Sequence, residues 1–171
     1  MINISKIIVL FSVFFACSLC VGQTKSTERS VADTVSMYNK LDNYLHSLSK
    51  NLTVKNYDAI IFMSDGTCSS CMKSFSDFVC QQLLNEQRIL IILNAKGQQF
   101  NTSPYLSDTV KNVVTDYSND FIRLKIASER TVVIILKENN IDGIYPVNPA
   151  TLSDQITLLA RMKHRQKGYS K

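Results

Sequence analysis

Two cysteines separated by two serines are the residues of this chain best suited to chemistry. They form the segment Cys68-Ser69-Ser70-Cys71. At the start of a helix, positions i and i+3 share one face, so the two sulfurs can reach each other. Such a pair supports thiol–disulfide exchange, in which one thiolate attacks a disulfide and the second thiol resolves the mixed disulfide that forms.

A position at a helix start predicts different roles for the two thiols. Unpaired backbone N–H groups and the helix dipole favour an anion there, so we expect a lowered pKa at Cys68. Cys68 is therefore the predicted attacking thiolate. Cys71 lies one turn further along, and we expect it to be more buried and to stay protonated until it resolves the mixed disulfide.

The segments that flank the pair predict a strand–helix–strand unit. Residues 57–63 and 89–93 are short apolar runs, which are typical of buried central strands. Between them, apolar residues follow the cysteines at helical spacing: Met72, Phe75, Phe78, Val79 and Leu83. Two such strands run parallel with a right-handed crossover, and the cysteines then lie where the first strand passes into the helix.

Apolar residues at helical spacing also occur before and after this unit. Residues 31–48 carry an apolar stripe that predicts an amphipathic helix. A second helix is predicted over residues 106–117 from a similar stripe: Leu106, Val110, Val113, Val114 and Tyr117. Residues 121–126 fit no single element.

The C-terminal part of the chain predicts a hairpin and a closing helix. Residues 131–136 form an apolar strand, 137–140 a polar turn and 141–147 a returning strand. Asn148 and Pro149 then open a final helix, because asparagine caps helices and proline suits the first turn. This order of elements predicts one α/β domain with a mixed central sheet and helices on both faces.

The first residues have the build of a secretory signal. Lys6 precedes an apolar run over residues 7–16, and small residues lead to Gly22 and the polar Gln23. That run is shorter than the roughly 20 residues of a bilayer span. We therefore expect an exported, periplasmic or envelope-associated protein, with an uncleaved anchor as the alternative. The predicted division has three parts: 1–22 as signal peptide, 23–56 as lead and amphipathic helix, and 57–171 as the main domain.

Charge and the signal segment restrict the partners. The formal net charge is +5, and the basic residues crowd the C-terminal tail without interleaved aromatics, so we expect no nucleic-acid partner. These tail residues are Arg161, Lys163, Arg165, Lys167 and Lys171. Membrane association is expected only if Cys17 is lipidated or the signal is retained.

The strand at 57–63, the Cys-Ser-Ser-Cys segment, the helix after it and the late hairpin with its closing helix together resemble the thioredoxin-like superfamily. The resemblance covers residues 57–165 and looks most like exported thioredoxin-like proteins of the bacterial envelope. It implies a thioredoxin-like fold with residues 31–48 as an extra N-terminal helix. It also implies a thiol–disulfide oxidoreductase without a bound cofactor, with Cys68 and Cys71 as catalytic residues. The implied partners are protein thiols or disulfides and an upstream redox protein.

Three positions depart from the pattern of that superfamily. Thr67 stands where a tryptophan usually precedes the first cysteine, and Phe62 stands where many members bury an aspartate. Arg130 stands where most members place a cis-proline. We expect the charge of Arg130 to lower the pKa of the first cysteine further. Glu129 would raise that pKa or accept the proton of the second cysteine.

The cysteines also allow other functions. Because of the three departures, a redox-inactive binding or scaffold module that keeps the disulfide as a clip is one alternative. A copper or zinc carrier is another, although a closed zinc site needs four ligands and both histidines, His46 and His164, lie far away in the sequence. Cys80 is out of phase with Cys71 on a helix, so we expect it to be a buried, small apolar side chain.

Overall fold

The computed structural model describes most of the chain after its first thirty residues. The described ranges are 31–65, 69–94, 102–126 and 130–168. Several sequence predictions therefore concern residues outside them. These are the signal segment, which includes Cys17, and the individual residues Thr67, Cys68 and Glu129.

A five-stranded mixed sheet forms the centre of the fold, with the order β3-β2-β1-β4-β5. Its strands are β1 (Ala59–Asp65), β2 (Ile89–Asn94), β3 (Val113–Asp116), β4 (Arg130–Lys137) and β5 (Asn140–Pro146). β1, β2 and β3 run parallel, whereas β4 is antiparallel to β1 and β5 is antiparallel to β4. The predicted α/β class with a mixed sheet is confirmed.

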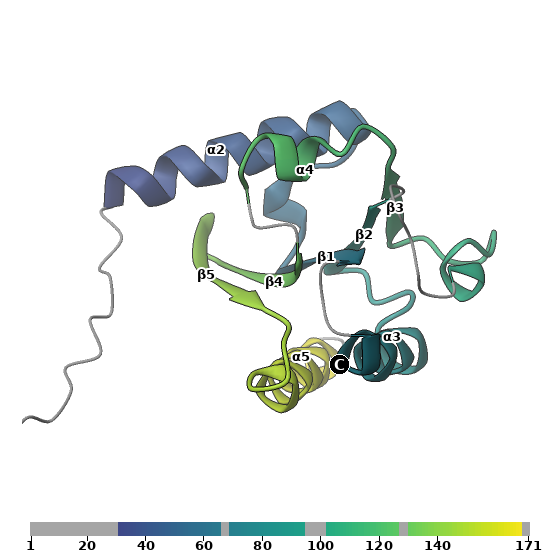
Figure 1. The fold of residues 1–171 in the computed structure, drawn as a ribbon. Coiled ribbons are helices and arrows are strands. Elements are labelled where there is room, and N and C mark those ends of the chain that lie inside the picture. The colour runs from purple at the N-terminus through teal and green to yellow at the C-terminus, as the bar shows by residue number, and fades with distance from the viewer. Residues whose placement is uncertain (1–30, 66–68, 95–101, 127–129, 169–171) are drawn as a thin grey trace, which may run out of the picture.

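Helices cover both faces of the sheet (Figure 1). α2 (Val31–Leu48) and the short α4 (Asp120–Arg123) lie on one face, and α3 (Ser69–Gln82) and α5 (Leu152–Gly168) lie on the other. Two single-turn 3-10 helices, Val54–Asn56 and Ser103–Tyr105, complete the described elements. None of the helices in these ranges combines the length and the apolar character needed to cross a bilayer.

Successive side chains of the central strands point to opposite faces of the sheet, and this divides the core into two layers. In β1, Ile61 and Met63 face α3 and α5, whereas Ile60 and Phe62 face α2 and α4. Because both faces are covered, the strand is apolar at every one of these positions rather than at every second one. The continuous apolar runs in the sequence thus have a direct structural cause.

α2 is an integral part of this core. Its side chains Leu41, Tyr44 and Leu45 are almost fully buried and pack in the same layer as Phe62. The predicted amphipathic helix is confirmed. Its apolar stripe lies on the sheet, so α2 folds together with the strands that follow.

The helix predicted over residues 106–117 is wrong. Residues 113–116 form the edge strand β3, which pairs parallel with β2. Leu106 is 59% exposed and Tyr117 is 83% exposed, and Val113 and Val114 pack against different core layers, so these residues do not share one face. Val113 and Val114 are β-branched, and such residues favour a pleated strand over a helix.

The hairpin and the final helix are confirmed. Glu138 and Asn139 have φ values of 51° and 60°, as a tight turn between β4 and β5 requires. Ahead of α5, the side-chain Oδ1 of Asn148 accepts hydrogen bonds from the backbone N–H groups of Ala150 (2.9 Å) and Thr151 (3.2 Å). Asn148 thus caps the turn that leads into the helix.

Two buried tyrosines predict a loss of stability in alkali. The hydroxyl of Tyr44 donates to Asp116 at 2.9 Å, and the hydroxyl of Tyr105 donates to the carbonyl of Ser76 at 3.1 Å. Burial raises the pKa of both phenols above the ordinary value of about 10, and the nearby Asp116 charge raises that of Tyr44 further. The folded chain therefore keeps protons that the unfolded chain releases.

We expect the free energy of unfolding to fall as the pH rises above about 10, with each such phenol contributing up to about 1.4 kcal/mol per pH unit. Urea unfolding between pH 9 and pH 11.5 measures this slope. Tyr44→Phe should lower the number of protons released on unfolding by up to one, which makes the fall of the unfolding free energy with pH shallower. An unchanged slope in that variant would contradict the assignment.

Candidate functional site

Cys71 lies in the first turn of α3, directly after the central strand β1. The β1-α3-β2 unit is the predicted strand–helix–strand unit, and β1 and β2 are parallel. Cys71 is only 5% exposed and is disulfide-bonded, whereas Cys80 is a free thiol. The partner of Cys71 lies outside the described residues, as does Cys68. Cys71 is buried, as expected, and its greater burial relative to Cys68 stays a prediction.

Three buried polar residues surround the point where the chain leaves β1 for the cysteine segment. They are Ser64 at the end of β1, Asn94 at the end of β2 and Thr131 near the start of β4. The hydroxyl of Thr131 accepts a hydrogen bond from the backbone N–H of Ser64 at 3.0 Å and lies 2.8 Å from the carbonyl of Ser64. The amide of Asn94 donates to the hydroxyl of Ser64 at 3.4 Å.

This cluster coincides with an irregularity in the sheet. The pairing of β1 with β4 is regular up to Phe62 and Val132, and then shifts so that Asp65 lies opposite Arg130. The shift is typical of a β-bulge, which takes backbone groups out of the ladder. The side chain of Thr131 supplies hydrogen-bond partners for the Ser64 backbone at this place.

Thr131 also contacts the helix that carries Cys71. Its Oγ1 lies 3.2 Å from Sδ of Met72, the residue that follows Cys71. Met72 is buried and packs with Phe75 in the layer between the sheet and α3. The start of β4 is therefore joined both to the end of β1 and to the first turn of α3.

The sequence did not identify Thr131 as a site residue. It begins an unbroken apolar run over residues 131–136, and such a run does not reveal which side chains point to which face. The contact with Met72 settles this for Thr131. The only available signal was a hydroxyl residue at the start of a strand that is otherwise entirely apolar.

Of the two predicted tuning residues, one is described. Arg130 is exposed and lies opposite Asp65 in the strand register. Side chains alternate along β4, and Thr131 and Val133 face α3, so Arg130 lies on the side of Val132, toward α2 and α4. Its influence on the Cys68 thiolate stays a prediction, as does that of Glu129.

Phe62 has a clear structural role. It lies on the α2 and α4 side of the sheet and stacks on Phe121, with ring centroids 3.9 Å apart. This position therefore belongs to the apolar layer on the opposite face of the sheet from α3. It supplies no proton acceptor for Cys71.

Cys80 is half-buried rather than buried as predicted. It packs against the core layer below α3 and lies close enough to Tyr105 to hydrogen-bond with its hydroxyl. Within the described ranges, no group of three side chains from His, Cys, Asp and Glu is arranged to hold a metal ion. His46 belongs to α2 and His164 to α5.

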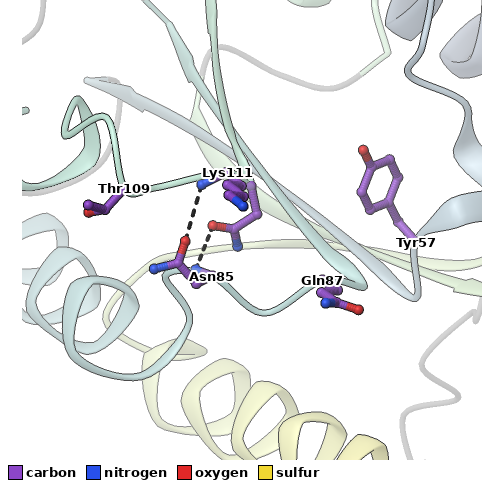
Figure 2. A pocket seen from close by; sticks show the side chains of 6 residues that line it. Tyr57, Asn85, Gln87, Thr109 and Lys111 are labelled. Carbon is purple, nitrogen blue, oxygen red and sulfur yellow. Dashed lines mark hydrogen bonds between the residues drawn. The ribbon is translucent and has the colours of Figure 1, made fainter.

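A polar cavity of about 420 Å³ opens at the other end of the sheet, where the parallel strands begin (Figure 2). It is lined by Tyr57, Asn85, Gln87, Thr109, Lys111 and Asn112. Asn85 N–H donates to Asn112 Oδ1 at 2.7 Å, and Lys111 N–H donates to Asn85 Oδ1 at 3.1 Å. Asn112 also donates to the carbonyls of Leu83 and Ile89. These amides hold the α3–β2 loop against β3, so we assign the cavity walls a structural role.

No family model, curated protein sequence or solved structure matches this chain. The arrangement around Cys71 offers a buried disulfide sulfur at a helix start, with hydroxyl and amide groups at the end of β1 beside it.

Proposed function

We propose that the chain is a thiol–disulfide oxidoreductase that exchanges disulfides with protein thiols through Cys68 and Cys71. The observation that carries the proposal is the disulfide of Cys71, which is buried in the first turn of a helix that follows the central parallel strand. We propose Cys68, three residues earlier, as its partner. Such a disulfide at a helix start supports exchange, because the helix favours the thiolate that forms on reduction.

The reducing direction proceeds in two exchange steps. The Cys68 thiolate attacks a substrate disulfide, a bond forms between Cys68 and one substrate sulfur, and the other substrate sulfur leaves as a thiolate that takes up a proton. Cys71 then loses its proton and attacks the Cys68 sulfur, which releases the second substrate thiolate. The substrate gains two electrons and two protons, and a dithiol of an upstream redox protein restores the pair. The oxidising direction is the reverse.

The fold and the sequence support two finer parts of the proposal. The β1-α3-β2 unit, the β4–β5 hairpin and the closing helix α5 follow the order expected of a thioredoxin-like domain, to which α2 is added. The charged start, the short apolar run and the small residues within 1–22 support export to the cell envelope. No bound cofactor is needed, since the electrons pass directly between sulfur atoms.

The test is the reduction of insulin by dithiothreitol, followed as the precipitation of the freed B chain. Wild-type protein should accelerate it, and Cys68→Ser should reduce the rate to that of dithiothreitol alone. Cys80→Ser is the matched control, because it removes the free thiol of the same helix and should retain the wild-type rate. Acceleration that survives Cys68→Ser, or its absence in folded wild-type protein, would contradict the proposal.

A redox-inactive binding module is the second candidate, and the position of Phe62 favours it. Phe62 stacks in the core on the far face of the sheet, so no carboxylate occupies the place from which many thioredoxin-like proteins assist the second thiol. This candidate predicts a folded protein whose Cys71 disulfide forms normally but whose wild type and Cys68→Ser variant are equally inactive toward insulin.

A further inference from the structure

We propose that Thr131 is a positioning residue that sets how readily the Cys71 disulfide is reduced. The inference deepens the proposed function, because it concerns the same disulfide. Thr131 is fully buried, and its hydroxyl lies between the end of β1 and the first turn of α3. The cysteine segment connects these two elements.

The contact with β1 fixes one end of that segment. The Thr131 hydroxyl accepts from the Ser64 N–H at 3.0 Å and can donate to the Ser64 carbonyl at 2.8 Å. These bonds occur where the sheet register shifts, between Phe62 and Asp65. The side chain therefore holds in place a piece of backbone that the regular strand ladder no longer holds.

The contact with α3 fixes the other end. Oγ1 of Thr131 lies 3.2 Å from Sδ of Met72. A hydroxyl has one proton, so the Ser64 carbonyl and the Met72 sulfur share it. The Thr131 carbonyl accepts from the N–H of Val147 at 2.9 Å, which fixes the residue itself in the fold. One side chain thus joins β1 to α3 on both sides of the cysteines.

Because Thr131 holds the two ends of the cysteine segment together, it favours the disulfide over the dithiol. In glutathione buffer, the protein disulfide and two glutathione thiols exchange with the protein dithiol and one glutathione disulfide. Ring closure is easier when the two ends of the segment are already held close together. Without the Thr131 hydroxyl, the ends separate more freely in the reduced state and the disulfide re-forms less readily.

We expect Thr131→Val, which keeps the shape but lacks the hydroxyl, to make the disulfide about tenfold easier to reduce. A tenfold change corresponds to about 30 mV for this two-electron couple. Thr131→Ser, which keeps the hydroxyl, should stay within about twofold of wild type. The measurement equilibrates each protein in glutathione mixtures, traps free thiols by alkylation and determines by mass spectrometry the fraction in which Cys71 is reduced.

Tyr44→Phe is the matched control for a general loss of stability. It removes a buried hydroxyl that donates to Asp116 on the α2 side of the sheet, whereas Met72 lies in the layer on the opposite face. The measured equilibrium compares two folded states, so a loss of stability common to both cancels. Tyr44→Phe should therefore leave the reduction equilibrium unchanged. If Thr131→Val does not fold, Thr131→Ala replaces it as the variant without a hydroxyl.

Three results would overturn the role of Thr131: no shift in Thr131→Val or Thr131→Ala, an equal shift in Thr131→Ser, or an equal shift in Tyr44→Phe. The titration needs no catalytic turnover, so it gives an answer even if the protein is inactive toward insulin. Peptide mapping of the oxidised protein is done first. A partner of Cys71 other than Cys68 would contradict the proposed function, while the titration would still report on Thr131.

Discussion

A Cys71→Ser variant is expected to lose disulfide-reducing activity and to accumulate as a covalent adduct with its substrate. In the proposed mechanism Cys68 still attacks the substrate disulfide, but no second thiol is present to release the product. Release then depends on dithiothreitol from solution. Intramolecular groups in good geometry react far faster than dissolved ones, so we expect turnover to fall by roughly a hundredfold or more.

The adduct is measured directly. Denaturing electrophoresis without reductant should show a band that contains the protein and an insulin chain, and reductant should remove it. The double variant Cys68→Ser/Cys71→Ser should form no adduct. The double variant Cys71→Ser/Cys80→Ser should form as much adduct as Cys71→Ser alone. An adduct that persists without Cys68 but disappears without Cys80 would transfer the chemistry to the free thiol of α3.

The buried position of Cys71 explains why the two thiols should not exchange roles. Cys71 is almost inaccessible in the described structure, so a folded protein substrate cannot reach its sulfur. In the proposed mechanism, loss of Cys68 therefore stops the reaction at its first step, whereas loss of Cys71 stops it at the second. The two single variants should thus differ in the species that accumulates, although both lack turnover.

The sequence predicts the part of the fold that surrounds the cysteines. β1 from Ala59 to Met63 and β2 from Ile89 to Leu93 are apolar at every position because helices cover both faces, and this makes short apolar runs easy to recognise. α3 is amphipathic and has Cys71 in its first turn, which is the strand-to-helix junction that the apolar spacing predicts for this cysteine. The turn at Glu138 and Asn139 is similarly evident from local composition.

Contacts between segments that are far apart in the sequence could not be predicted from these local patterns. The segment 113–116 is a strand because it completes the edge of the sheet beside β2, yet its apolar residues fit helical spacing equally well. Thr131 matters because the β1–β4 register shifts beside it, and register is a property of two strands rather than of one. Asp116 cannot be recognised from its own segment either, because its partners come from α2 and from the segment that leads into α4.

Asp116 is a fully buried carboxylate that joins three elements. Oδ2 accepts from the Tyr44 hydroxyl at 2.9 Å and from the Phe121 N–H at 3.2 Å. Oδ1 accepts from the N–H and the hydroxyl of Ser118 and from the N–H of Asn119, all within 2.9 Å. Burying a carboxylate is costly unless it is hydrogen-bonded, and these contacts meet that need. Asp116 thereby anchors α2 to the end of β3 and to the start of α4.

Asp116→Ala should lower the free energy of unfolding by about 3–5 kcal/mol, because it leaves several buried donors without acceptors. Tyr44→Phe alone should cost about 1.5–3 kcal/mol, the usual contribution of a hydrogen bond to a charged group. In the Asp116→Ala background the Tyr44 hydroxyl has lost its acceptor, so its removal should then cost less than about 0.5 kcal/mol or stabilise the protein. Urea unfolding of all four proteins near pH 7 measures this cycle.

Asp142→Ala is the control for the loss of a negative charge alone. Asp142 is exposed on β5, and we expect its replacement to change stability by no more than about 0.5 kcal/mol. Additive effects of Tyr44→Phe and Asp116→Ala would show that the two side chains do not depend on each other. A large coupling energy would instead establish that α2 is held to the sheet through this buried pair, on the face opposite to the one that carries the Cys71 disulfide.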